Sequence, residues 1–162
     1  MPLLTLIPLV IWIVLRIVAD VTFDQDIGGH LKRAADANTV ELARQELDIA
    51  LKNMESRGCT EGYTSIVYRT PDEDVGFWYE NITSSYLALG NLPPDTDALT
   101  ISNELMKLRE TLLDHKESGE KVTAPEGISI YPHNVAYVLS CIACLALVLV
   151  GLYWAVKDEW FD

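Results

Sequence analysis

Two histidines are the residues most suggestive of chemistry. His115 falls on the apolar stripe expected for a helix that begins near Asp97, and His30 lies near the inner face of an earlier expected helix. Facing imidazoles in a helical bundle can bind haem. No C-x-x-C-H attachment motif accompanies them, so we expect core or boundary histidines and no cofactor. A small-ligand pocket at His30 and His115 is the alternative.

Carboxylates are abundant, but their spacing is not that of an active site. Asp72, Glu73 and Asp74 stand together at an expected helix start, where acidic side chains stabilise the helix dipole without any further role. A di-metal bundle would need Glu-x-x-His on two helices, and the sequence has none. It also lacks the G-x-S-x-G, P-loop, H-E-x-x-H and dinucleotide-binding motifs. We therefore expect no metal site and no enzymatic activity.

Cys141 and Cys144 form a C-x-x-C, which suggests redox chemistry or metal binding in a soluble protein. Here the pair lies in a long apolar stretch without a second pair, so helix packing is the favoured interpretation. Ala136, Ser140 and Cys144 recur every four residues. Such a stripe of small residues predicts close approach of another helix, either the N-terminal apolar segment or a partner.

Charge and hydropathy indicate two kinds of segment in one chain. The 162 residues carry a net charge of -12, yet 49% are apolar and the mean hydropathy is +0.15. A strongly acidic net charge and a positive mean hydropathy can occur in the same chain because the apolar residues are concentrated at its two ends. The excess of acidic residues argues against nucleic-acid binding, which needs clustered Lys and Arg. Three cysteines exclude a disulfide-dense scaffold.

The N-terminal segment 1–19 is predicted to be a transmembrane anchor. Leu3 to Ala19 hold a single charge, Arg16, and 17 helical residues span about 26 Å, close to the thickness of a bilayer core. A cleaved signal peptide is the alternative. It is disfavoured because no basic residue precedes the apolar run and Ile17 to Ala19 is a poor cleavage site.

The segment 134–156 is predicted to be a second transmembrane helix. Its 22 residues from Val135 to Val156 are uncharged and would span about 33 Å. Aromatic residues stand near both ends, as in an interfacial belt. A short acidic tail, 157–162, follows. Two spans place both termini on the same side of the membrane, and the acidic middle 20–133 is expected to be extracytoplasmic.

The middle domain is predicted to be all-α, a bundle of about three helices. Apolar residues at helical spacing indicate helices over 30–57, 71–90 and 97–118, the first with a kink near 36–39. Gly28 and Gly29 are expected to relax the link to the membrane. The segments 59–69 and 120–133 show no clear period. Trp78 and Tyr79 are expected in the core, with a partner-binding surface as the alternative.

The order of one apolar span, a helical bundle and a second apolar span resembles bacterial transmembrane receptors with a helical-bundle sensor domain. The resemblance implies a bundle that binds a small ligand. Such receptors continue into an output domain, whereas six residues follow Val156 here, so any signal would pass through a partner. We expect a non-enzymatic, membrane-anchored interaction or scaffold protein, or an accessory subunit of a membrane complex. A sensor-like bundle is the alternative.

Overall fold

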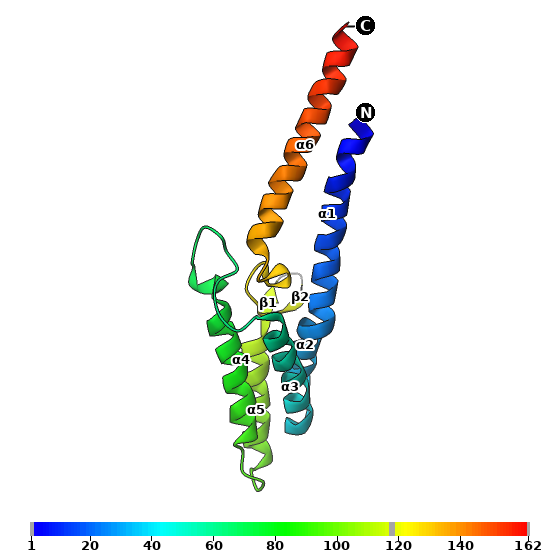
Figure 1. Cartoon of the computed structure of the whole chain (residues 1–162). Coiled ribbons are helices and arrows are strands. Elements are labelled where there is room, and N and C mark those ends of the chain that lie inside the picture. Colours follow the sequence, from blue (N-terminus) through cyan, green and yellow to red (C-terminus); the bar gives the residue numbers. More distant parts are fainter. Residues whose placement is uncertain (1, 117–118, 162) are drawn as a thin grey trace.

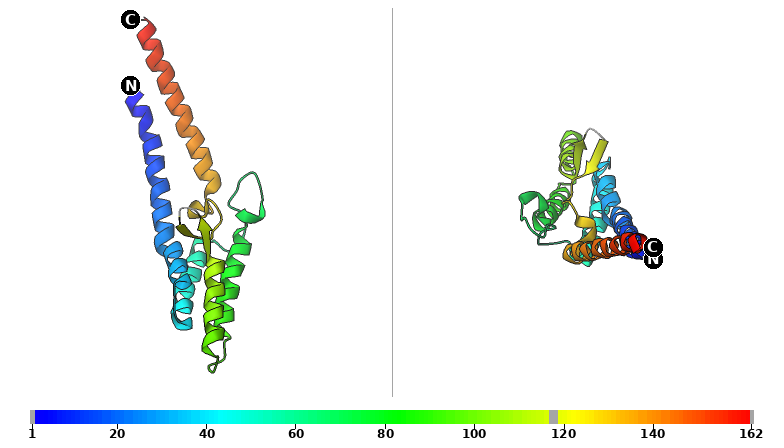
Figure 2. Two further views of the ribbon diagram at one scale, coloured as in Figure 1. Left: turned by 180° about the vertical axis from the view of Figure 1, so that it is seen from behind. Right: turned by 90° about the horizontal axis from the view of Figure 1, so that it is seen from above.

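The computed structural model describes residues 2–116 and 119–161 and confirms a mostly helical chain with a long apolar helix at each end (Figure 1). The two terminal helices run side by side, and both termini lie at the end of the molecule away from the bundle (Figures 1 and 2). The helices are α1 (Pro2–Phe23), α2 (Gly29–Ala35), α3 (Val40–Arg57), α4 (Val75–Gly90), α5 (Ala98–Leu112) and α6 (Asn134–Phe161).

The helix α1 continues into α2 without leaving helical geometry. The connection is one π-helical segment, Asp24–Gly28, in which the Gly29 N–H bonds to the Asp24 carbonyl five residues earlier. A Cβ on Gly29 would lie 2.8 Å from that carbonyl oxygen. The expectation that Gly28 and Gly29 relax the link is therefore wrong. The absence of side chains at these positions lets a tight turn form inside one continuous rod.

Local signals place most helix boundaries as expected. The break at 36–39 separates α2 from α3, and Thr39 caps α3 by accepting a hydrogen bond from the Leu42 N–H (3.3 Å). Gly58 ends α3 in the left-handed region, with φ of +72°. The break divides the first predicted helix in two, so the described part of the bundle consists of α2, α3, α4 and α5.

The start of α4 follows the predicted capping signal with one addition. Residues Pro71–Glu73 form a single 3₁₀ turn, and the Glu73 carboxylate accepts from the Thr70 N–H (3.4 Å). Asp74 then caps α4 by accepting from the Phe77 N–H (3.0 Å). The extra turn gathers three acidic side chains at the end of α4 nearest the apolar terminal helices (Figure 1).

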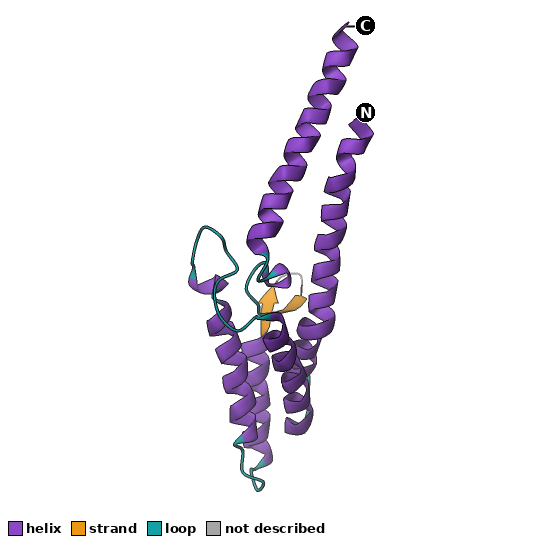
Figure 3. Cartoon of the chain, viewed as in Figure 1, coloured by secondary structure: helices purple, strands orange, loops and turns teal. Residues whose placement is uncertain are grey.

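The predicted helix over 97–118 is wrong at its C-terminal end. The helix α5 ends at Leu112, and a hairpin follows, with β1 (Leu113–Lys116) antiparallel to β2 (Gly119–Val122) (Figure 3). Leu112 and Leu113 are both buried, and adjacent residues of a regular helix diverge by about 100°. Extended backbone at Leu113 resolves this conflict. His115 consequently lies in β1, opposite Glu120.

The core closes where α1, α4 and the segment after the hairpin meet. Trp78 is 7% exposed, packs against Phe23 with ring centroids 6.4 Å apart, and donates its indole N–H to the Thr123 carbonyl (2.7 Å). Below it, α2 packs on α3 and α5, and α4 packs on the same two helices. The largest fully buried side chains are Ile27, Leu31, Leu47, Met54, Ile82, Leu112, Val75 and Cys59.

The terminal helices pack on each other through one side only. The Trp12 indole N–H donates to the Tyr137 carbonyl (3.1 Å), and a Cβ on Gly151 would lie within 3 Å of the Thr5 side chain. The remaining surfaces of α1 and α6 are apolar and exposed. Both helices are long and apolar enough to cross a membrane.

The predicted stripe of small residues divides between two faces of α6. Cys144 is 9% exposed on the side of the helix that faces α1, and Cys141 lies half-buried beside it. Ala136 and Ser140 are exposed. The three residues therefore do not form a single packing surface for α1. Ala136 and Ser140 remain available to another helix, which stays a prediction.

Candidate functional site

A groove along α4 is lined by groups that could bind a ligand or partner. It has two parts that share Asn81. The upper part lies where α4 begins, nearest the apolar terminal helices, and has a volume of about 570 Å³. The lower part lies between α4 and α5 and has a volume of about 310 Å³. We call the two together the α4 groove.

Five carboxylates line the upper part. They come from three separated segments of the chain: the turn before α4, strand β1 and the connection after β2. None of the described residues that line this part is basic. The aromatic ring of Phe77, 62% exposed, lies beside them. The carboxylates belong to Asp72, Glu73, Asp74, Asp114 and Glu126.

Two of these carboxylates also maintain local structure. Glu73 accepts from both the N–H and the hydroxyl of Thr70, and Asp74 caps α4. Among the described residues, no three His, Cys, Asp or Glu side chains come close enough together to hold a metal ion. The upper part is therefore a dispersed field of negative charge. Such a field suits several separate cationic groups on a partner better than one metal ion.

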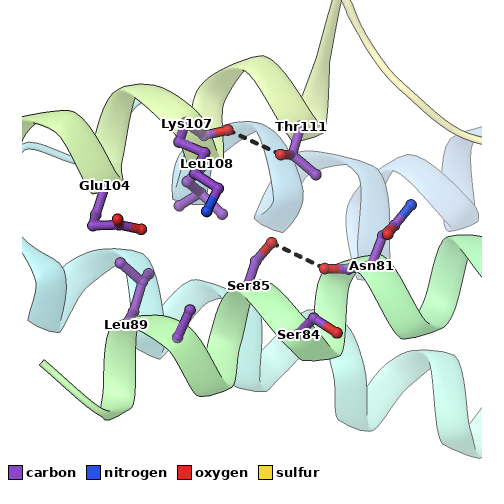
Figure 4. A pocket seen from close by; sticks show the side chains of 9 residues that line it. Asn81, Ser84, Ser85, Leu89, Glu104, Lys107, Leu108 and Thr111 are labelled. Carbon is purple, nitrogen blue, oxygen red and sulfur yellow. Dashed lines mark hydrogen bonds between the residues drawn. The ribbon is translucent and has the colours of Figure 1, made fainter.

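The lower part is lined by short polar side chains from two facing helices (Figure 4). Ser85 and Thr111 point into it, and each donates its hydroxyl proton to a carbonyl of its own helix, at 2.9 Å in both cases. Their oxygen lone pairs remain as acceptors for a ligand. Glu104 and Lys107 add one charge of each sign. These side chains favour hydrogen bonding to a ligand. Among the described lining residues, no hydrogen bond joins a hydroxyl to an acid or base that would activate it as a nucleophile.

His30 lies in a polar contact between α2 and α3. Its Nδ1 lies 2.6 Å from Oε2 of Glu46, which is 5% exposed, and Arg33 contacts the other oxygen of that carboxylate (2.5 Å). Two and three helical turns further along α3 from Glu46, Asn53 donates to the Asp26 carbonyl and Arg57 pairs with the Asp26 carboxylate, both at 2.5 Å. We call these contacts the α3 clamp, because they fasten α3 to the continuation of α1.

The contacts of the α3 clamp involve His30 but not His115, so they do not make up the predicted pocket between these two histidines. His30 is engaged by Glu46, and His115 lies on strand β1, where its side chain is outside the described residues. The polar hollow of the bundle lies between α4 and α5. The early end of α5 takes His115 off the helix face from which the prediction was made, and a pocket shared by the two histidines stays a prediction.

Trp78 and Tyr79 belong to the bundle and do not form a free partner surface. Trp78 is buried, as described above. Tyr79 is half-buried, and its hydroxyl donates to the Glu55 carboxylate (2.8 Å), a hydrogen bond that raises the pKa of the phenol. The exposed apolar residues of α4 are its neighbours on the outer face, Phe77 and Leu87, at 62% and 55% exposure. Their ten-residue separation leaves them about 80° apart around the helix, so the sequence spacing did not mark them as one exposed face.

Comparisons of this chain with protein-family models, with curated proteins and with solved structures find no match.

Proposed function

We propose that the protein is a non-enzymatic, membrane-anchored interaction protein, acting as a scaffold or accessory subunit of a membrane complex. The observation that carries the proposal is the α4 groove, an acidic surface with an exposed aromatic residue, on a bundle joined to an apolar helix. The continuous helix from α1 to α2 and the α3 clamp support it. They would hold the groove at a fixed position relative to the bilayer.

The partner that this groove fits is a protein segment that presents Lys or Arg side chains and one apolar anchor. The acidic lining contributed by Asp72, Glu73 and Glu126 would attract cations, and Phe77 offers the apolar contact. Ala136 and Ser140, which are exposed on α6, would add a second contact if the partner also has a membrane helix.

For localisation, we propose that α1 and α6 both cross the bilayer, with the two termini on one side and the acidic domain on the extracytoplasmic side. The lipid-facing surfaces of the two helices support the crossing, since 6% and 0% of their most apolar windows are buried within the molecule. The strongly acidic middle, which follows an N-terminal apolar segment, supports the orientation.

The test is purification of the full chain from native membranes in mild detergent, with identification of whatever accompanies it. The charge-removing pair Asp72→Asn with Glu126→Gln should lower the yield of the partner, and added salt should do the same. The matched control is Asp95→Asn with Glu110→Gln, which removes the same charge from exposed positions outside the groove. A protein that is monomeric in detergent with no reproducible companion would refute the proposal.

The alternative function, a sensor that binds a small ligand and signals through a partner, is favoured by the lower part of the groove. Its volume of about 310 Å³ and its exposed acceptors suit a small polar molecule. Mass spectrometry of small molecules released from the purified protein tests this alternative. A bound compound that disappears in Ser84→Leu, whose longer side chain would occupy the groove, would favour the sensor.

A further inference from the structure

The segment between α3 and α4 carries an exposed apolar tip. Ile66, Val67 and Tyr68 are 46%, 76% and 72% exposed. In views from opposite sides, the segment rises from the start of α4 and stands beside the first turns of α6 (Figures 1 and 2). The tip therefore points toward the same end of the molecule as the two apolar helices, away from the bundle core.

Hydrogen bonds hold this segment in place at both its base and its tip. At the base, the Thr64 N–H bonds to the Glu73 carbonyl (3.1 Å) and the Val75 N–H to the Gly62 carbonyl (2.9 Å). At the tip, the Ser65 hydroxyl oxygen accepts from the Tyr68 N–H (3.1 Å) and the Val67 N–H (3.4 Å). The apolar side chains are thus exposed by an ordered turn.

The composition of the segment differs from that of the rest of the domain. Residues 62–70 contain no acidic residue, although the chain has a net charge of -12, and they include one cation, Arg69. The Arg69 guanidinium lies 5.7 Å from the Tyr63 ring centroid. Tyrosine, arginine and aliphatic side chains together are typical of segments at the boundary between lipid headgroups and acyl chains.

We propose that residues 62–70 form a third membrane contact, with Ile66, Val67 and Tyr68 inserted into the leaflet that α1 and α6 enter from the side of the bundle. This inference rests on the proposed membrane anchoring. Two packed helices leave the domain able to tilt about their common interface. A third contact to one side of them fixes that tilt and sets the direction in which the α4 groove faces.

The test uses an environment-sensitive fluorophore on single cysteines of the full chain in phosphatidylcholine nanodiscs. Cys141→Ala and Cys144→Ala give the parent, and Cys59 stays because it is buried, which raises the pKa of its thiol and protects it from labelling. The parent without an added cysteine measures background labelling. The labelled positions are Val67→Cys, Leu99→Cys at the distal end of α5 and Leu149→Cys on the outer surface of α6.

Leu99 is the matched control, because it is an apolar residue exposed to a similar extent, 71% against 76% for Val67. The quencher is a lipid that carries a nitroxide at the top of its acyl chain. The emission maximum of the label at 67 should shift to shorter wavelength. The nitroxide lipid should quench about half of its fluorescence, since insertion at the headgroup boundary brings the label close to the nitroxide. The label at 99 should keep its fluorescence.

The label at 149 separates the two possible failures. Quenching at 149 with a response at 67 equal to that at 99 would overturn the third contact and leave the anchoring intact. Absence of quenching at 149 would overturn the anchoring and the inference that depends on it. A shift at 67 without lipid quenching would mean that protein covers the tip, and this also overturns the inference.

Discussion

Replacing Gly29 by alanine should destabilise the bundle, although alanine is the better helix former. An unhindered Gly-to-Ala change inside a helix gains about 1 kcal/mol. At Gly29 the new Cβ would lie 2.8 Å from the Asp24 carbonyl oxygen, a backbone atom in the π segment that cannot move alone. Overpacking typically costs about 1–3 kcal/mol. We expect the cost to exceed the gain, with a net loss of about 1 kcal/mol.

The assay is thermal unfolding of the full chain in mild detergent, followed by tryptophan fluorescence in a background where Trp12, Trp154 and Trp160 are replaced by Phe, so that the buried Trp78 is the reporter. For a domain of this size, a loss of 1 kcal/mol corresponds to a decrease of about 4 °C in Tm. Gly28→Ala is the matched control, because its Cβ would meet the flexible Asp24 carboxylate, which can rotate away. A Tm for Gly29→Ala equal to or above that of the wild type would refute the continuous-rod geometry.

Three further substitutions test other contacts in the fold. Glu46→Ala removes the buried carboxylate of the α3 clamp and should lower the free energy of unfolding by about 1–3 kcal/mol in chemical denaturation. Hydrogen bonds from Thr100 lower the pKa of Asp97, which caps α5. The stabilisation by this cap is therefore present above the ordinary carboxyl pKa and is lost as the pH falls through the lowered pKa. In Asp97→Ala, this acid-dependent decrease in Tm should disappear. Gly151→Leu should push α6 away from Thr5 and increase the distance between spin labels at the two termini. Leu149→Ala, on the exposed side of α6, should leave that distance unchanged. Equal distances in the two variants would show that α1 and α6 do not pack at Gly151.

The helices that sequence predicted correctly are those set by local signals. Apolar periodicity, the cap at the start of α4 and Gly58 define α3 and α4 without help from the rest of the chain. The end of α5 could not be predicted in this way, because Leu108, Leu112 and His115 fit a helical period. Burial of the adjacent Leu112 and Leu113 is a tertiary requirement, and it turns the chain into the hairpin.

The candidate site was only partly visible in the sequence. Asp72, Glu73 and Asp74 are adjacent and could be identified as an acidic cluster. Asp114 and Glu126 lie about forty to fifty residues later and join them only because the unpredicted hairpin folds back beside the start of α4. The π segment is likewise a product of packing, since the α3 clamp holds Asp26 within it and His30 just after it.

The central claim is that α1 and α6 cross the bilayer together and hold the bundle on one side of it. Its most direct test is side-specific accessibility of the full chain in sealed, uniformly oriented vesicles. A cysteine introduced by Asp95→Cys, in the exposed connection between α4 and α5, would be probed with a membrane-impermeant reagent, and tags at both termini with a protease. We expect residue 95 to react from one side and both tags to be cleaved only from the other. Cleavage of either tag from the side on which residue 95 reacts would contradict the account.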